Sequence, residues 1–272
     1  MPCPPEVAGK PLRETTSAGA RLVVLDLEGM HGSWVKASPR DWKNALAASS
    51  LATRHGLPVV SIRSAAELRA ALAAGRTAYF AIVNPYGETC PVEGPGTWTD
   101  MLDAIRDYVA HGGIWVEAGS ASFYGVAWKD GAGWHREHLG PKGLDRLGSA
   151  IHSTDIDEPD VALRANATAA DWFPPQVLKQ IAATRSQVNR APCDGKGETV
   201  FPLVVDDERR AWFGGHRLGG WGMFWRLGGS NPDRDLALAV VPAALLYQFE
   251  HIPVPIPPAP YRKVMPSGGG RE

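Results

Sequence analysis

The chain has 272 residues, and its 28 Lys and Arg residues almost balance its 29 Asp and Glu residues, so that the formal net charge is −1. This balance excludes a whole-chain basic field of the kind that attracts nucleic acid or an anionic membrane. A hydrophobic content of 44% suits one large globular domain and excludes a coiled coil, a collagen-like chain and a mostly disordered chain. No apolar run approaches the roughly 20 residues of a membrane-spanning helix. We therefore expect neither a nucleic-acid partner nor a membrane span.

Both ends of the chain are predicted to be extended. Residues 1–20 contain no apolar stretch like that of a signal peptide, and residues 251–272 are rich in Pro and then in Gly. We expect an N-terminal arm and a C-terminal tail around a single domain at 21–250. The protein is then either cytoplasmic or exported after removal of a leader that this sequence does not contain.

From Arg21 onward, short apolar runs alternate with well-capped amphipathic helices. Continuous apolar runs of this length are typical of strands that are buried on both faces of a parallel sheet. Strands are expected at 21–27, 58–62, 78–83 and 114–118, and helices at 39–55, 65–74 and 97–110. This alternation predicts βαβ units, and right-handed crossovers then place helices on both faces of the sheet. The predicted fold class is therefore α/β.

The pattern is weaker in the second half of the chain. Residues from about 127 to 200 are rich in Gly, Pro, His and charged groups, and we expect an irregular insertion there with one short helix at 175–184. The stretch 211–229 predicts a β-hairpin around a pair of glycines. A final buried helix is expected to begin at Asn231 as N-cap and to kink or break at Pro242.

Three segments carry a pattern that occurs in one known superfamily. They are NPYGETCP at 84–91, YVAHGGIWVEAGSASFYG at 108–125, and HRLGGWGMFWRLGG at 216–229 before the final helix. Their order resembles the class I glutamine amidotransferase-like superfamily, and is most similar to the trehalose-utilisation (ThuA-like) proteins and to the amidotransferase-like domain of β-galactosidases. The resemblance covers roughly 21–126 and 211–250. It implies a flavodoxin-like parallel sheet in which the first and third strands are neighbours, followed by a C-terminal hairpin and helix.

The chain departs from this superfamily where catalysis would occur. In catalytic members, the turn after the fourth strand holds a cysteine nucleophile in a G-x-C-x-G elbow, whereas residues 117–122 read EAGSAS here. The His-x-Glu pair that those members use as base and orienter is also missing, because His251 is followed by Ile-Pro-Val-Pro. No residue at these positions can supply the thiolate nucleophile that glutamine hydrolysis requires. We predict that glutaminase activity is absent, which favours a ligand-binding or accessory module related to carbohydrates.

Carboxylates follow three of the predicted strands. Ligands of open parallel sheets bind beyond the carboxyl ends of the strands, and this rule selects Asp26, Glu88 and Glu117 as candidate catalytic residues. Carboxyl groups that lie close together acquire different pKa values. Such groups can also bind a divalent cation or catalyse the hydrolysis of glycosides. The alternative function is therefore a glycosidase-like or metal-assisted hydrolase. The structural alternative is that these residues are solvated loop residues or helix caps.

Further polar and aromatic side chains at the same edge are candidates for ligand binding. They are Glu28, His31, Trp34, Tyr86, Cys90, Ser120, Ser122, Trp128 and Trp134. The tryptophans suit the stacking of sugar rings, with core packing as the alternative. The expected partner is a small molecule or a carbohydrate, and the extended tails also suit docking on a larger enzyme or on a second copy of this chain.

Three other features leave alternatives open. Cys90 precedes a helix, which can lower a thiol pKa, but no His is fixed beside it, so that an inert thiol is the alternative. His135 and His138 would share a face on a helix, as metal ligands can, although the neighbouring glycines favour a loop. Glu117 is expected on the same strand face as Trp115. A buried carboxylate there needs a partner. Either backbone N–H groups of the following turn donate hydrogen bonds to it, or it lies beside Glu88 and shares a proton or a bound cation with it.

Overall fold

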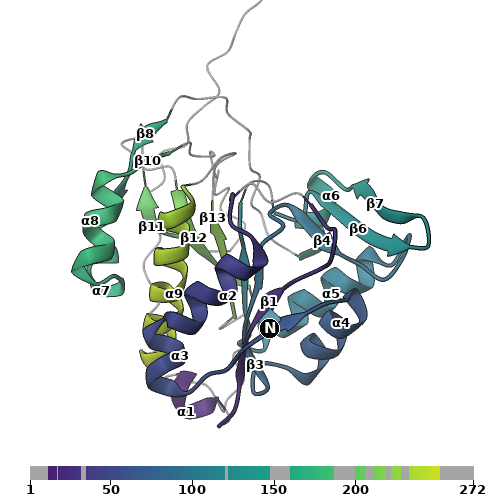
Figure 1. The fold of residues 1–272 in the computed structure, drawn as a ribbon, viewed down its shortest axis with the longest axis horizontal. Helices are drawn as coiled ribbons and strands as arrows, with labels where there is room; N and C mark the ends of the chain where they lie inside the picture. Colours follow the sequence, from purple (N-terminus) through teal and green to yellow (C-terminus); the bar gives the residue numbers. More distant parts are fainter. Residues whose placement is uncertain are drawn as a thin grey trace, which may run out of the picture.

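An eight-stranded sheet forms the centre of the computed structural model of this chain (Figure 1). The structure describes residues 12–16, 18–31, 35–119, 122–147, 160–186, 200–205, 211–218, 222–227 and 233–251. In spatial order the strands are β2 (Val59–Ile62), β1 (Arg21–Leu25), β3 (Tyr79–Asn84), β5 (Ile114–Glu117), β13 (Gly222–Leu227), β12 (Ala211–Leu218), β11 (Val200–Val205) and β9 (Arg164–Ala165). Neighbouring strands are parallel from β2 to β13 and antiparallel from β13 to β9. The molecule is therefore a mixed α/β protein with a mostly parallel sheet.

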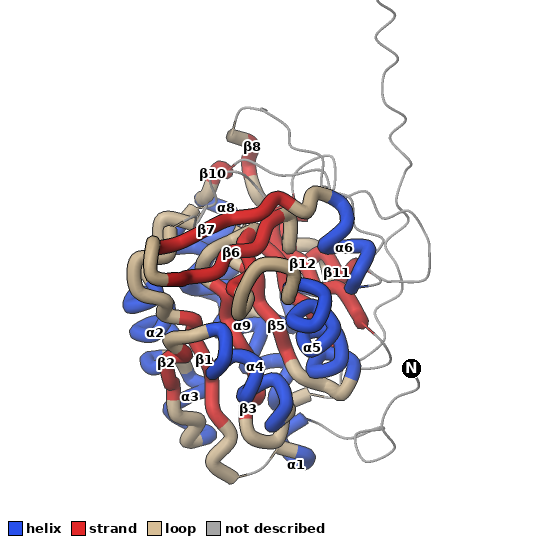
Figure 2. Tube along the Cα trace, turned by 90° about the vertical axis from the view of Figure 1, so that its right-hand side faces the viewer, coloured by secondary structure: helices blue, strands red, loops and turns tan. Residues whose placement is uncertain are grey.

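Helices cover both faces of this sheet (Figures 1 and 2). One face is covered by α2 (Pro39–Ala48), α3 (Ser50–His55), α7 (Ala169–Trp172), α8 (Pro175–Ala183) and α9 (Arg234–Glu250), and α1 (Leu12–Thr15) contacts α9. The other face is covered by α4 (Ala65–Ala74), α5 (Trp98–Ala110) and α6 (Pro141–Leu147). Alternate residues of β1 belong to the two cores: Leu22 and Val24 pack on the α9 side, and Val23 and Leu25 on the α5 side. This is the pattern of a strand that is buried on both faces.

Two smaller sheets accompany the large one. A three-stranded sheet of β4 (Thr89–Pro91), β6 (Gly125–Asp130) and β7 (Gly133–His138) lies on the α5 side of the molecule (Figure 2). The other pairs β8 (Val161–Ala162) with β10 (Arg185–Ser186). The structure thus differs from the expected irregular insertion, because β6 and β7 form a regular hairpin around the turn at Gly131.

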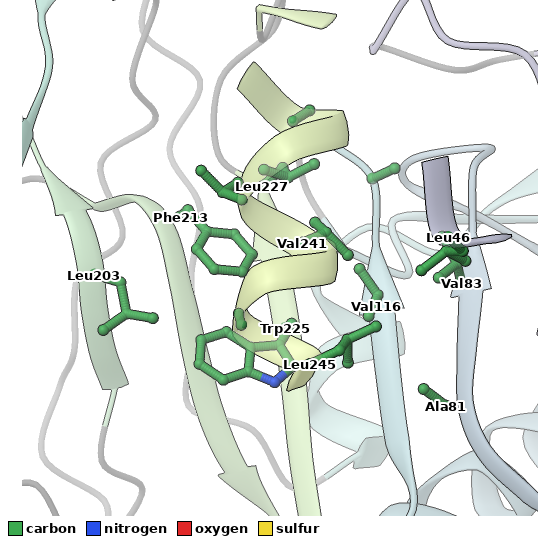
Figure 3. Packing of buried hydrophobic residues seen from close by; sticks show 14 of the residues in the cluster. Leu46, Ala81, Val83, Val116, Leu203, Phe213, Trp225, Leu227, Val241 and Leu245 are labelled. Atoms are coloured by element: carbon green, nitrogen blue, oxygen red, sulfur yellow. The ribbon is translucent and has the colours of Figure 1, made fainter. Parts of the chain in front are cut away.

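The larger core lies between the sheet and α9. Trp225 is fully buried there, where it stacks on Phe213 at a ring distance of 5.0 Å (Figure 3). Val241 and Leu245 of α9 pack against these rings. Pro242 is buried within the same helix, and α9 continues through it without a break. Within the described residues, no helix is long and apolar enough to cross a membrane.

The four predicted strands of the first half are all present, and the predicted pairing of the first with the third is confirmed by the parallel pairing of β1 with β3. The predicted helix at 39–55 is divided. Ser49 adopts an extended conformation with ψ 154°, ends α2 by donating its hydroxyl to the Leu46 carbonyl, and caps α3 by accepting from the Ala52 N–H. Serine commonly competes for backbone groups in this way, which explains the division.

The final helix begins later than predicted. Its N-cap is Asp233, whose carboxylate accepts a hydrogen bond from the Leu236 N–H at 2.7 Å. The expected N-cap Asn231 lies outside the described residues. The predicted hairpin before this helix is confirmed by the antiparallel pairing of β12 with β13.

Candidate functional site

The carboxyl ends of the parallel strands bring several of the predicted residues to one edge of the sheet. Asp26 directly follows β1, Asn84 is the last residue of β3, and Glu117 is the last residue of β5. Glu117 is in register with Asn84 on one side and with Arg226 of β13 on the other. Three polar residues thus stand at the same level on three adjacent strands, and the Asn84 amide is within hydrogen-bond distance of the Glu117 carboxyl.

Glu117 is completely buried. Its Oε2 accepts hydrogen bonds from the Trp115 indole N–H at 2.5 Å and from the Asn84 amide at 3.2 Å. Burial raises the pKa of the Glu117 carboxyl to about 8, and the charge of Glu88 adds to this rise. These two hydrogen bonds and one from the Phe123 backbone N–H, in the turn after β5, oppose it. Trp115 lies on the same face as Glu117, as predicted, while Val116 faces the opposite core. The carboxyl group is thus held beneath the surface of the edge.

Asn84 connects Glu117 to the loop that carries Glu88. The Asn84 amide also donates to the carbonyl groups of Thr89 at 3.1 Å and Gly87 at 3.4 Å, and its Oδ1 accepts from the Tyr86 N–H. An asparagine at the end of a strand, before Pro-Tyr-Gly, is a signal for such a turn. The rule that selects residues beyond the carboxyl ends of the strands also selects Asn84, but the sequence did not indicate that its amide connects Glu117 to this loop.

Tyr86 fastens the loop after β3 to the loop after β1. Its hydroxyl accepts from the Leu27 N–H at 2.6 Å and donates to the Leu27 carbonyl at 3.2 Å. Burial, with a smaller effect of Asp26, raises the pKa of Tyr86 to about 12. The hydroxyl therefore stays protonated and is engaged with backbone groups rather than presented at the surface.

Cys90 lies in β4 and is completely buried. Burial raises the pKa of its thiol well above the usual value, and the nearby Glu117 acts in the same direction. A thiol in this environment is neutral at physiological pH and is not activated as a nucleophile.

The tryptophans of the β6–β7 hairpin serve as contacts within the protein. The indole N–H of Trp134 donates to the Glu28 carbonyl at 2.9 Å, which fastens the hairpin to the loop after β1. Trp128 packs against the core on the α5 side and stacks on the His135 ring at 5.5 Å. The Glu28 side chain is itself exposed, with Lys129 Nζ at 3.9 Å.

The histidines at 135 and 138 do not share a helix face. Both lie on β7, where residues three apart point to opposite sides of the strand. His135 pairs with Asp130 at 2.9 Å, whereas the His138 ring lies 5.9 Å from that of Tyr124. Among the described residues, no three His, Cys, Asp or Glu side chains come together as a metal site.

The remaining candidates are only partly described. His31 is exposed, and Ser122 is buried in the turn that follows β5. Trp34 and Ser120 lie outside the described residues. The edge therefore presents Asp26 and Glu88 as half-buried carboxylates above a buried layer of Glu117, Tyr86 and Cys90.

The turn after β5 has an unusual backbone. Phe123 has a φ of 56° and is, in the described part of the chain, the one residue other than glycine in the left-handed region. Its ring is fully buried, 5.9 Å from that of Trp115 and 5.5 Å from that of Phe224. A Cβ at Gly143 of α6 would meet the Phe123 carbonyl oxygen at 2.0 Å, so only glycine allows this close approach. Such a conformation is costly for a bulky residue and persists because the surroundings impose it.

Comparison with known proteins adds little to this geometry. No family model matches the chain, and no curated protein matches it. Among solved structures, an exo-β-1,4-mannosidase from Opitutaceae bacterium strain TAV5 is similar, with a TM-score of 0.36 and 12% sequence identity. The match covers 85% of this chain and 33% of the mannosidase, so that the chain spans about a third of that protein's length. A similarity this low carries no argument about function.

Proposed function

We propose that this chain is an amidotransferase-like domain that binds a ligand, of carbohydrate type, at the carboxyl edge of its sheet and has no glutaminase chemistry. Support for the superfamily comes from the order β2-β1-β3-β5, which is the order of the first four strands in flavodoxin-like sheets. The C-terminal hairpin and buried helix expected from the resemblance complete the same arrangement. In such sheets the carboxyl edge is the place where ligands bind.

One observation supports the proposed absence of glutaminase activity. The segment after β5 reads Glu117-Ala118-Gly119, where the catalytic members hold a cysteine elbow, and Cys90 is completely buried with a raised pKa. A thiol that is neither exposed nor ionised cannot attack the side-chain amide of a glutamine that binds at this edge.

We expect no release of ammonia from glutamine above the uncatalysed background, for either the wild-type protein or Cys90→Ser. The measurement is a coupled ammonia assay at pH 7 to 9, with a glutamine-hydrolysing amidotransferase as the positive control. Ammonia release by the wild type that Cys90→Ser abolishes would make Cys90 a nucleophile and overturn the proposal.

A second candidate function is a hydrolase that uses two carboxylates. It is favoured by the electrostatic effect of Glu88 on Glu117, which adds to the rise of the Glu117 pKa to about 8. Pairs of carboxyl groups with separated pKa values supply the acid and the base of many glycosidases. The complete burial of Glu117 opposes this function, because a proton donor must reach the bond that breaks.

The binding proposal predicts that the protein does not hydrolyse aryl glycosides. Release of nitrophenol from nitrophenyl mannoside, glucoside and galactoside should stay at background. Turnover that is lost in Glu88→Gln, but kept in Glu137→Gln on the exposed side of β7, would establish the hydrolase instead.

A further inference from the structure

Tyr124 is the one large hydrophobic side chain that is exposed in the described part of the chain, with 42% of its surface accessible. It directly follows the strained residue Phe123, so the same turn points one aromatic ring into the core and presents the next one to solvent. A strained backbone of this kind is a recurring feature of binding sites. The position of Tyr124 therefore calls for a functional explanation.

The backbone of Tyr124 is held rigidly. Its carbonyl accepts two hydrogen bonds, from the Leu139 N–H at 2.8 Å and from the Gly140 N–H at 3.0 Å, so that the turn is fixed to the end of β7. The buried Phe123 ring and the close approach of Gly143 fix it from the inside. A ring on such a support loses little conformational entropy when a ligand stacks on it.

Two polar residues lie near Tyr124, one by its side chain and one by its backbone. The exposed His138 ring lies 5.9 Å away at an angle of 72°, which leaves it edge-on to Tyr124. In the backbone, the Gly125 N–H donates to the Glu88 carbonyl at 3.1 Å, and Gly125 pairs with Thr89. The backbone of Glu88, a half-buried residue of the candidate site, therefore lies beside the backbone of Tyr124, just before β4 and β6 pair.

We propose that Tyr124 is the stacking platform of a sugar-binding subsite, with Glu88 and His138 as the polar groups beside it. The inference rests on the proposed ligand-binding function and names its ligand class and its central residue. A flat aromatic face packs against the C–H groups of a pyranose ring, while a carboxylate and an imidazole exchange hydrogen bonds with its hydroxyl groups. One ring among polar neighbours is too small an apolar area for a protein partner.

Two substitutions at the same position test the platform. Tyr124→Phe keeps the flat face and loses only the hydroxyl, whereas Tyr124→Leu keeps an apolar side chain without a flat face. The probes are mannohexaose, cellohexaose and xylohexaose, measured by titration calorimetry and saturation-transfer NMR on the full chain. We expect at least one probe to bind, Tyr124→Phe to bind it within about threefold of the wild type, and Tyr124→Leu and Glu88→Gln to bind it about tenfold more weakly.

Circular dichroism spectra that match the wild type will show that each variant is folded. Binding that is unchanged in Tyr124→Leu but lost in Glu88→Gln would overturn the platform and leave a ligand site at the carboxyl edge. If none of the three oligosaccharides binds, the sugar subsite is overturned as well. Neither result affects the absence of glutaminase chemistry, which the ammonia assay tests separately.

Discussion

Glu117→Gln should make the stability of the protein much less dependent on pH. In the folded protein, burial keeps this carboxyl protonated up to about pH 8, whereas in the unfolded chain it ionises near its usual pKa of 4.5. Between these values the folded state binds one proton more, so that this group lowers the free energy of unfolding by about 1.4 kcal/mol for each pH unit of rise. Its stabilising contribution is complete below pH 4.5 and is lost as the pH rises to about 8.

Urea unfolding from about pH 5 to about pH 9 measures this effect. We expect wild type and Glu117→Gln to be similar at the acidic end, because the amide closely resembles the protonated acid, and the variant to be more stable by several kcal/mol at the alkaline end. Glu137→Gln, on the exposed side of β7, is the matched control and should follow the wild type. If Glu117→Gln instead loses stability at alkaline pH, Glu117 is ionised and stabilised by its neighbour Arg226.

Trp225→Ala should produce the largest loss of stability among single substitutions in the core. Trp225 is fully buried, stacks on Phe213 at 5.0 Å and meets Trp172 edge-on at 5.4 Å (Figure 3). Its indole N–H also donates to Gln248 at 2.8 Å, inside α9. Truncation leaves a cavity and an unsatisfied amide oxygen, and we expect a cost of about 3–5 kcal/mol.

The matched control is Trp128→Ala, because Trp128 is half-buried at the edge of the α5-side core. Denaturant unfolding at one pH should show a clearly smaller loss for Trp128→Ala. Trp225→Phe should lie between the wild type and Trp225→Ala, since it restores part of the volume but not the hydrogen bond. Equal losses for Trp225→Ala and Trp128→Ala would show that the hairpin is as important to the core as the centre of the sheet.

Elements that are buried on both faces were predictable from the sequence. The apolar runs at β1, β3 and β5 are visible in the sequence, and the flavodoxin-like order implied by the resemblance predicted that β1 and β3 are neighbours. The break at Ser49 was not predictable from periodicity, because a serine hydroxyl chooses between several backbone partners according to local geometry. The β6–β7 hairpin was missed because its half-exposed strands lack the apolar run that the central strands have.

For the candidate residues, the sequence predicted that they gather at one edge of the sheet but not how deeply each side chain is buried. Asp26, Glu88 and Glu117 follow neighbouring strands, as predicted, yet Glu117 lies fully buried while the other two are half-buried. Cys90 is buried in β4, which pairs with β6 of the hairpin, and the Tyr86 hydroxyl is engaged with the Leu27 backbone. The strand that pairs with β4 lies about 40 positions further along the chain, so no local sequence pattern predicts this burial.

The position of β13 has a consequence for how the chain is synthesised. β5 is complete at Glu117, but the strand that pairs with its outer side begins at Gly222, more than 100 residues later. Until β13 has been synthesised, β5 is an unpaired and strongly apolar edge strand of the growing chain, and it can pair with a second chain instead. We expect loss of the C-terminal third to leave that edge unpaired and to favour aggregation.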